Sequence, residues 1–359
     1  MLLRKGWVRY LRTFRSFTRV SIATGCVVNE TNQETEGEEQ QETAIEVVIE
    51  NLDIPWEITK NEEAFYLTER AGTIVKYENG EVQRHPVQLS VPIHHEGEGG
   101  LLGLQLSPDF ITSKSAFIYH TYQENGNTFN RVVKVVLKDG EWREDQELLE
   151  NIPGSLYHNG GRVRIGPDEM LYITTGDAGS PELAQDVKST AGKILRMTLS
   201  GQIPTDNPFK GSLVYSYGHR NPQGLAWDEK GQLYNSEHGQ SAHDEINKIE
   251  AGKNYGWPVI EGDKKEKGME TPLYHSGNDT WAPSGIVVKD NKLYMAGLRG
   301  EEIRAFNLSG NKSEVIVDKI GRIRSLFQEN NTIYAITNNK DGRGKAIKED
   351  DRMVKTEID

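Results

Sequence analysis

The stretch "RVRIGPDEMLYITTGD", residues 162–177, decides the fold. It consists of a short apolar strand, a polar turn built on Gly166, Pro167 and Asp168, and a second strand that contains a tyrosine. Glycine, proline and aspartate favour turns, whereas short runs of apolar, aromatic and β-branched residues favour strands. These residues therefore predict a β-hairpin.

The same pattern recurs along the chain. It appears at residues 56–69, 224–239, 285–297 and 325–338, and with a longer turn at residues 101–122. The tyrosines of the six segments are Tyr66, Tyr119, Tyr172, Tyr234, Tyr294 and Tyr334, with separations of 53, 53, 62, 60 and 40 residues. Repeats of ~40–60 residues with about four short strands each are typical of β-propellers. We therefore expect an all-β fold, a six-bladed β-propeller with four-stranded antiparallel blades.

Helical signals are almost absent, apart from a turn expected around residues 181–187. Two stacked β-sandwich domains would explain the spacing of the strands but not the recurring hairpin. Propellers place their sites on loops at the mouth of the central channel, so the informative residues should lie just outside the hairpins. The propeller is expected to span residues 46–359 as the catalytic domain.

Composition excludes several functions. The chain has 359 residues and a net charge of −12, which argues against nucleic acid as a partner, because phosphate binding draws on clustered lysine and arginine. No apolar run reaches the ~20 residues that a membrane helix needs. The single cysteine, Cys26, excludes a disulfide within the chain and cysteine-based zinc sites.

Residues 1–25 form a basic leader that ends in Thr24-Gly25-Cys26, which resembles a bacterial lipoprotein cleavage box. Three arginines interrupt the apolar stretch that a signal peptide needs, so a disordered leader with a chance cysteine is the alternative. Residues 26–45, rich in Glu, Gln and Thr, predict a disordered acidic tether. We expect an extracytoplasmic protein, either secreted or held at the cell surface through a lipid on Cys26.

His158 and Asp177 flank the opening hairpin. His158 lies just before its first strand, and Asp177 follows its second strand. Because a hairpin brings the start of one strand beside the end of the next, the two side chains are expected to meet. A histidine oriented by a carboxylate can act as a general base. The alternative is a surface histidine and a turn aspartate.

Arginines lie at the starts of other strands. Arg220 and Asn221 precede the strand of "NPQGLAW", and the fixed fork of an arginine suits carboxylates and quinoid oxygens. Arg322 and Arg324 are two apart, so on a strand they share one face, which suggests a polyanion. The alternatives are a loop held by turn chemistry and a solvated strand face.

The stretch "SEHGQSAHDEIN", residues 236–247, invites a metal interpretation. His238 and His243 suggest zinc, but a glycine-containing loop also offers the backbone carbonyls that calcium takes as ligands. Asp244 and Glu245 are adjacent and point to opposite faces of an extended chain, so they would not easily hold one ion together.

Six segments then occur in a specific order. They are "EGEGGLLGLQLSPDF", "HNGGRVRIGPDEMLYITTGDAG", "AGKILRM", "GHRNPQGLAWD", "SEHGQSAHDEIN" and "GKNYGWP". Together they resemble the soluble quinoprotein glucose and aldose sugar dehydrogenases, the glucose/sorbosone dehydrogenase family, from about residue 54 to residue 354. The resemblance implies a propeller that binds pyrroloquinoline quinone (PQQ) and calcium and oxidises the C1 hydroxyl of aldoses to lactones by hydride transfer to PQQ.

The resemblance also implies residue roles. His158 matches the general base, Asp177 the residue that orients it, and Arg220 the arginine that stabilises charge on the quinone oxygen. The cofactor-binding residues would be Asn221, Arg322, Arg324, Arg299, Gln185 and Glu98. The backbone carbonyls of Gly239 and Gln240 would bind the active-site calcium, and Asp244, Glu245 and Tyr255 a second, structural calcium.

Two positions depart from the family pattern. Glu98 stands where the glucose enzymes carry glutamine, and Leu298 stands where a cofactor-binding lysine is expected, with Arg299 as its neighbour. The long insertions of the glucose-specific enzymes are missing, so the chain looks more like the compact, broad-specificity aldose branch.

The expected partners are an aldose and an external electron acceptor. A non-catalytic propeller that binds a glycan or a protein is the first alternative, because fold does not fix function. A propeller lactonase or hydrolase that uses channel calcium is the second, but it would need several carboxylates and asparagines around the ion, where these loops offer cations.

Overall fold

The structure, a computed structural model, describes residues 44–310 and 312–358. The predicted leader, Cys26 and nearly all of the predicted tether lie outside the described residues. Within them, no helix combines the length and apolar character needed to cross a membrane. The helical segments there are α1 (Phe110–Ser113) and a 3-10 turn, η1 (Pro181–Ala184), which falls where the sequence predicts a turn.

Strands dominate the described chain and fall into five sheets. The largest joins β2 (Pro55–Asn61), β3 (Ala64–Glu69), β4 (Thr73–Glu78), β5 (Glu81–Gln88), β6 (Leu101–Leu106), β7 (Ser115–Glu124), β8 (Asn127–Lys138) and β9 (Glu141–Pro153). Three four-stranded sheets follow, and the first consists of β10 (Val163–Ile165), β11 (Leu171–Thr175), β12 (Lys193–Met197) and β13 (Val214–Tyr217). The second consists of β14 (Pro222–Trp227), β15 (Leu233–Glu237), β16 (Glu245–Ile249) and β17 (Tyr274–His275). The third consists of β18 (Pro283–Lys289), β19 (Lys292–Gly297), β20 (Ile303–Asn307) and β21 (Ser313–Val317). The fifth sheet has the order β1-β24-β23-β22, from β1 (Glu46–Ile49), β22 (Ile323–Glu329), β23 (Thr332–Thr337) and β24 (Met353–Glu357).

The prediction of four-stranded antiparallel sheets holds in four sheets. The largest sheet has eight strands, because β5 and β9 pair in parallel where Val87 faces Trp142 and Gln88 faces Arg143. Each half of this sheet, β2–β5 and β6–β9, is antiparallel within itself. The pairing satisfies backbone groups that would otherwise be exposed at two strand edges. The count of six separate blades therefore stays a prediction.

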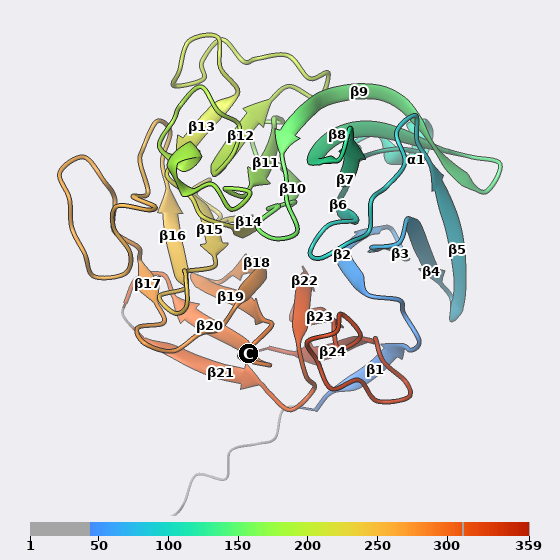
Figure 1. The fold of residues 1–359 in the computed structure, drawn as a ribbon. Coiled ribbons are helices and arrows are strands. Elements are labelled where there is room, and N and C mark those ends of the chain that lie inside the picture. The colour runs from blue at the N-terminus through green and yellow to red at the C-terminus, as the bar shows by residue number, and fades with distance from the viewer. Residues whose placement is uncertain (1–43, 311, 359) are drawn as a thin grey trace, which may run out of the picture. The chain divides into compact units, whose positions relative to one another are not determined.

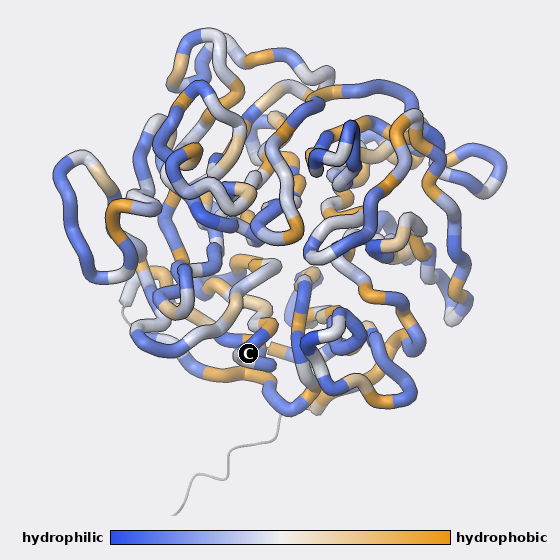
Figure 2. Tube along the Cα trace, viewed as in Figure 1, coloured by the Kyte–Doolittle hydropathy of each residue, from blue (hydrophilic) through white to orange (hydrophobic). Residues whose placement is uncertain are grey.

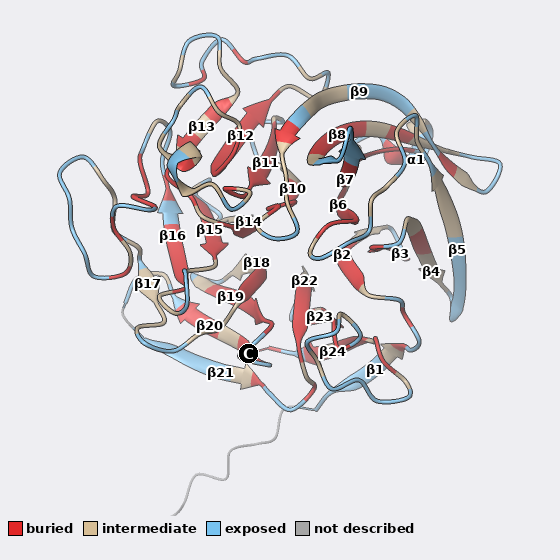
Figure 3. Ribbon diagram, viewed as in Figure 1, coloured by how far each residue is buried: buried red, intermediate tan, exposed pale blue. Residues whose placement is uncertain are grey.

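The first strands of the repeats surround the centre of the fold. Strands β2, β6, β10, β14, β18 and β22 each contact the next, and β22 contacts β2 (Figure 1). They are largely buried, whereas β1, β5 and β21 at the periphery are more exposed (Figure 3). A Cβ at Gly224 of β14 would lie 2.4 Å from the carbonyl oxygen of Ser284, so this close approach of neighbouring strands requires glycine.

The core lies between neighbouring sheets. Tyr172, the tyrosine of the opening stretch, packs in one cluster with Leu225 and Leu233 of the next sheet. The ring of Trp227 meets that of Tyr172 edge-on, with centroids 5.1 Å apart. Figure 2 shows hydrophobic residues spread along the strands, while the long peripheral loops are mostly hydrophilic. The repeated tyrosine is thus a packing residue between sheets.

All six predicted hairpins are present, as the antiparallel neighbours β2–β3, β6–β7, β10–β11, β14–β15, β18–β19 and β22–β23. In each, the start of the first strand and the end of the second lie at one end, and the turn lies at the other. The loops at the first end carry most of the side chains that the sequence singles out.

Candidate active site

His158 and Asp177 meet as the sequence predicts. The Nδ1 atom of His158 lies 2.7 Å from Oδ1 of Asp177. The side chain of His158 is 22% exposed, whereas that of Asp177 is 1% exposed, so the imidazole faces solvent and the carboxylate lies behind it. The backbone of His158 has a φ of 59°, a left-handed conformation that costs about 1–2 kcal/mol in a residue other than glycine. Such strain is found at functional sites, where the surroundings hold it.

Asp177 stays a carboxylate. Burial raises its pKa, but the hydrogen bond and charge of His158 lower it, and the donors Gly179 N and Trp257 Nε1 lower it further, so the net shift is downward. Both donors lie 2.8 Å from the carboxylate oxygens. A carboxylate on Nδ1 keeps the ring proton there, which leaves Nε2 of His158 as the free acceptor.

Glu98 braces the loop that carries His158. Its Oε2 accepts a hydrogen bond from the backbone N–H of His158 at 3.1 Å, and its Oε1 accepts one from Nη1 of Arg343 at 2.8 Å. Burial raises the pKa of Glu98, but His238, Arg343 and these hydrogen bonds bring it down to about 2. Glu98 therefore acts as an anion with two protein partners, which gives the departure from glutamine a structural meaning.

Five arginines gather around Glu98 and Asp341, and we call them the site arginines: Arg70, Arg220, Arg322, Arg324 and Arg343. The Nη2 atoms of Arg322 and Arg324 lie 2.9 and 4.0 Å from Oδ2 of Asp341. Both residues are buried, at 7% and 5% exposure, so the alternative of a solvated strand face is wrong.

Several buried nitrogen atoms at the site lack hydrogen-bond partners. The Nε atoms of Arg220, Arg322 and Arg324 and Nε2 of His238 are buried and make no hydrogen bond within the described chain. Burial lowers the pKa of Arg324 to about 9, against the opposing effect of Asp341. A buried donor without a partner costs about 1–3 kcal/mol, more when it is charged. The donor set therefore fits a ligand with several carboxylates, which is the chemistry of PQQ.

Arg220 links this group to the pair formed by His158 and Asp177. Its carbonyl oxygen accepts the backbone N–H of Asp177 at 2.8 Å. Its guanidinium lies over the ring of Trp257 at 5.3 Å and donates to the carbonyl of His238 at 3.3 Å. Burial lowers its pKa, although Asp177 and other carboxylates act in the opposite direction.

Three residues predicted to bind the cofactor lie where they make contacts within the protein or face solvent. Asn221 is buried and accepts the backbone N–H of Gly160 at 3.1 Å, so it holds the His158 loop. Gln185 donates to the carbonyl of Trp257 at 2.6 Å. Arg299 is exposed, and its backbone N–H donates to the carbonyl of Trp281. Within the described residues, no hydrogen bond or ion pair connects its side chain to the site arginines.

The residues predicted to bind calcium differ in whether their oxygen atoms already have hydrogen-bond partners. Oδ1 of Asp244 accepts a hydrogen bond from the backbone N–H of Gly239. Its Oδ2 accepts three more, at 2.7–2.8 Å, from the Thr280 hydroxyl and from the backbone N–H groups of Trp281 and Ala282. Its carboxylate is thus already satisfied, which makes it a loop brace. The Tyr255 hydroxyl is also used, because it donates to a backbone carbonyl and accepts a backbone N–H.

Glu245 fits a cation better. It faces Glu237 across the β15–β16 register, and both are buried. Burial and the charge of Glu237 raise the pKa of Glu245 to about 8. Within the described chain, no donor binds the carbonyl oxygens of Gly239 or Gln240, and no group of three metal-binding side chains occurs. Calcium therefore stays a prediction.

The two histidines of the same stretch belong to no group of three metal-binding side chains within the described residues. His238 belongs to the site, and burial lowers its pKa to about 4, although Asp244 and Glu98 act in the opposite direction. His243 instead stacks on His275, with ring centroids 6.1 Å apart.

Sequence reasoning missed several site residues, namely Trp257, Arg70, Arg343, Asp341 and the part played by His238. Asp177 was found because it lies two residues after β11, the second strand of its hairpin. Arg70 lies directly after β3, the second strand of another hairpin, so the same criterion would have identified it. Trp257 stands in the quoted "GKNYGWP" but carries no local sign of its partner, which is 80 residues away.

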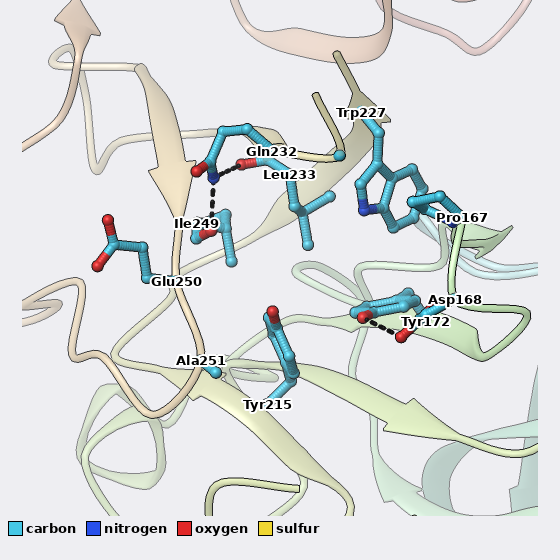
Figure 4. Close-up of a pocket in the computed structure, with 11 residues that line it drawn as sticks. Pro167, Asp168, Tyr172, Tyr215, Trp227, Gln232, Leu233, Ile249, Glu250 and Ala251 are labelled. Atoms are coloured by element: carbon cyan, nitrogen blue, oxygen red, sulfur yellow. Dashed lines mark hydrogen bonds between the residues drawn. The ribbon is translucent and has the colours of Figure 1, made fainter. Parts of the chain in front are cut away.

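A pocket of about 370 Å³ lies away from these residues, at the turn ends of the β10–β11 and β14–β15 hairpins (Figure 4). Its lining includes Tyr172, Tyr215 and Trp227. Of its two carboxylates, Asp168 and Glu250, Asp168 already binds Arg196 and the hydroxyl of Tyr172, both at 2.9 Å. Because its lining residues include no histidine, it offers no base comparable to His158.

Comparisons with known proteins identify the family of the chain. The model of the family Glucose / Sorbosone dehydrogenase matches residues 52–348. The chain is 34% identical over 262 residues to the quinoprotein glucose dehydrogenase B of Acinetobacter calcoaceticus, a match that covers 64% of this chain and 55% of that protein. It is 28% identical over 340 residues to the aldose sugar dehydrogenase of Escherichia coli, which covers 83% of this chain and 91% of that protein. The PQQ-bound aldose sugar dehydrogenase of Streptomyces coelicolor superposes with a TM-score of 0.82 at 37% identity, over 89% of this chain and 99% of that one. The chain belongs to the glucose/sorbosone dehydrogenase family.

Proposed function

We propose that the protein is a PQQ-dependent aldose sugar dehydrogenase that oxidises the C1 hydroxyl of aldoses to lactones. The observation that carries this proposal is a histidine–carboxylate pair beside buried arginines with unpaired donors. A relative whose structure holds PQQ and relatives named for glucose and aldose oxidation support it.

The chain itself supplies the base. Nε2 of His158 accepts the proton of the sugar C1 hydroxyl as the C1 hydrogen leaves as hydride. Asp177, held by Gly179 and Trp257, stabilises the imidazolium that forms. A positioned base of this kind contributes about 10²–10⁴-fold to the rate.

When bound, PQQ supplies the two-electron acceptor for that hydride. Arg322, Arg324 and Arg220 would hold it, because each has a buried Nε without a partner. Arginine presents a fixed fork of donors that matches carboxylates. Their charge also favours negative charge on the acceptor in the transition state.

Calcium is part of the proposal. The free carbonyls of Gly239 and Gln240 would bind it at the active site, and Glu245 with Glu237 would bind a second ion. A carboxylate whose pKa is about 8 beside another carboxylate is the kind of group that a cation stabilises in its ionised form. Asp244 would support these ligands by holding Gly239.

We also propose six blades, with the eight-stranded sheet counted as two, since six first strands contact one another in a closed ring. The lipoprotein box at Cys26 supports a cell-surface location with an external electron acceptor. Mass spectrometry of the membrane fraction checks this, and an intact, unmodified Met1 would exclude processing at Cys26.

The enzymatic test is direct. Metal-free protein is mixed with PQQ and calcium, cofactor binding is followed by its absorbance, and dye reduction is measured across a panel of aldoses. We expect sugar-dependent dye reduction that requires PQQ. Bound PQQ without sugar-dependent reduction would refute the enzyme, and glycan binding without turnover would favour a non-catalytic propeller.

A further inference from the structure

Trp257 touches two of the residues that carry the proposed chemistry. Its Nε1 donates to Oδ2 of Asp177 at 2.8 Å, and its ring lies 5.3 Å from the guanidinium of Arg220. Trp257 is 8% exposed, so the bond to Asp177 is shielded from water. We infer that Trp257 is a positioning residue that fixes the orientation and basicity of the His158–Asp177 pair.

The geometry divides the carboxylate between two tasks. Oδ1 of Asp177 faces His158 and the backbone N–H of Gly179, whereas Oδ2 faces Trp257. The indole therefore prevents the carboxylate from rotating and presents Oδ1 to Nδ1 of His158. It also removes part of the negative charge that Asp177 would otherwise direct at the imidazole.

The loop that carries Trp257 is held from the neighbouring sheet. Gln185 donates to the carbonyl of Trp257 at 2.6 Å and exchanges hydrogen bonds of 3.1 and 2.8 Å with Asn254. The backbone N–H of Trp257 donates to the carbonyl of Gly218 at 3.0 Å. Gln185 thus positions the indole from outside the ring of reacting groups.

Lys193 secures Gln185 in turn. Its Nζ donates to the carbonyls of Leu183, Ala184 and Ala191 at 2.7, 3.0 and 2.5 Å. All three ammonium hydrogens therefore have partners within the loop before and after Gln185. Lys193 therefore holds the backbone on both sides of Gln185, and polar contacts then run from Gln185 through Trp257 to Asp177.

The inference rests on the proposed function, and its consequence has a defined sign. The charged groups that face Asp177 are His158 and Arg220. Trp257→Phe keeps an aromatic ring under Arg220 but removes the N–H. Asp177 then attracts the His158 proton more strongly, so the imidazolium persists to higher pH and the base is lost at low pH.

The test compares wild type with Trp257→Phe and with Trp227→Phe, which makes the same exchange in the pocket of Figure 4, away from the site. For Trp257→Phe we expect roughly 10-fold lower kcat, KM changed less than about twofold, and the acid limb of the pH–rate profile moved upward by roughly 0.5 unit. Trp227→Phe should leave all three unchanged. Gln185→Met, which leaves the indole in place, should shift them in the same direction by less.

A double-mutant cycle separates positioning from packing. In an Asp177→Asn background, Trp257→Phe should lower kcat by less than about twofold. Equal losses in both backgrounds, with no pH shift, would overturn the inference.

A measurement on the cofactor-free protein keeps the inference independent of turnover. The imidazole of His158, followed by NMR, should titrate at higher pH in Trp257→Phe than in wild type. An unchanged midpoint would refute positioning even if sugar oxidation is confirmed. A shifted midpoint in a protein that fails to oxidise sugars would support positioning while the proposed function falls.

Discussion

Replacing Glu57 with glutamine should lower the free energy of unfolding by about 3–5 kcal/mol. Glu57 and Arg162 are both fully buried in the ring of first strands. The carboxylate binds Nη1 of Arg162, both Nη atoms of Arg164 at 2.7 and 3.1 Å, and the hydroxyl of Ser325 at 2.9 Å. Removing its charge leaves Arg162 buried without an anion, and breaking a buried pair in this way is among the costliest single changes.

Urea unfolding at neutral pH measures this loss of unfolding free energy. The melting temperature should fall by roughly 6–10 °C, at about 2 °C per kcal/mol. Glu63→Gln is the matched control, because its side chain is 86% exposed and lies 3.9 Å from Lys60. We expect a change below about 0.5 kcal/mol there.

The pH dependence has a defined sign. Burial raises the pKa of Glu57, but the charges of Arg162 and Arg164 lower it by more, so its folded pKa lies below the ordinary value of 4.5. Its stabilisation is therefore present above that pH and is lost as the pH falls through the folded pKa. The gap between wild type and Glu57→Gln should narrow in acid. A gap that is constant with pH, or a loss no larger than in the Glu63 control, would refute the buried ion pair.

Three further outcomes are expected. His158→Ala should lower kcat by roughly 10²–10⁴-fold while PQQ affinity, titrated by absorbance, changes less than about twofold; unchanged turnover would place the base elsewhere. Glu98→Gln should bind PQQ roughly 3–10-fold more tightly, because it removes an anion beside the site arginines, at the cost of the Arg343 ion pair; weaker binding would show that the brace matters more than the charge. Metal-free protein should lose stability as the pH rises from about 4.5 to about 8, because folded Glu245 holds its proton there, and calcium should restore more stability at pH 8 than at pH 5. Calorimetry with and without a chelator checks this, and Glu245→Gln should abolish the trend.

Local patterns determine what the sequence could predict. Each hairpin is encoded in a stretch of 13 to 22 consecutive residues, and the meeting of His158 with Asp177 follows from the antiparallel pairing of β10 with β11. The expected common face of Arg322 and Arg324 is borne out by their approach to one carboxylate, Asp341.

Contacts between distant segments could not be predicted. Arg343 reaches Glu98 across 245 positions, and no periodicity records that pair. The parallel pairing of β5 with β9 depends on how two sheet edges come together, which residue patterns within either strand do not specify. The saturation of Asp244 by Thr280, Trp281 and Ala282 likewise depends on the connection between β17 and β18, which lies 36 to 38 positions further along the chain.

Charge distribution connects the site to its ligand. The whole chain has a net charge of −12, yet one end of the ring brings together five arginines, from loops and from strand β22, beside the carboxylates Glu98 and Asp341. Exposed cations in an acidic protein would find partners on the surface, but Arg322 and Arg324 are buried and keep Nε atoms without partners. Burying cations without full compensation is unfavourable, so this arrangement is stable only if other contacts hold it or an anion completes it. A carboxylate-rich cofactor beside His158 meets that requirement and supplies the oxidant that a histidine–carboxylate pair lacks.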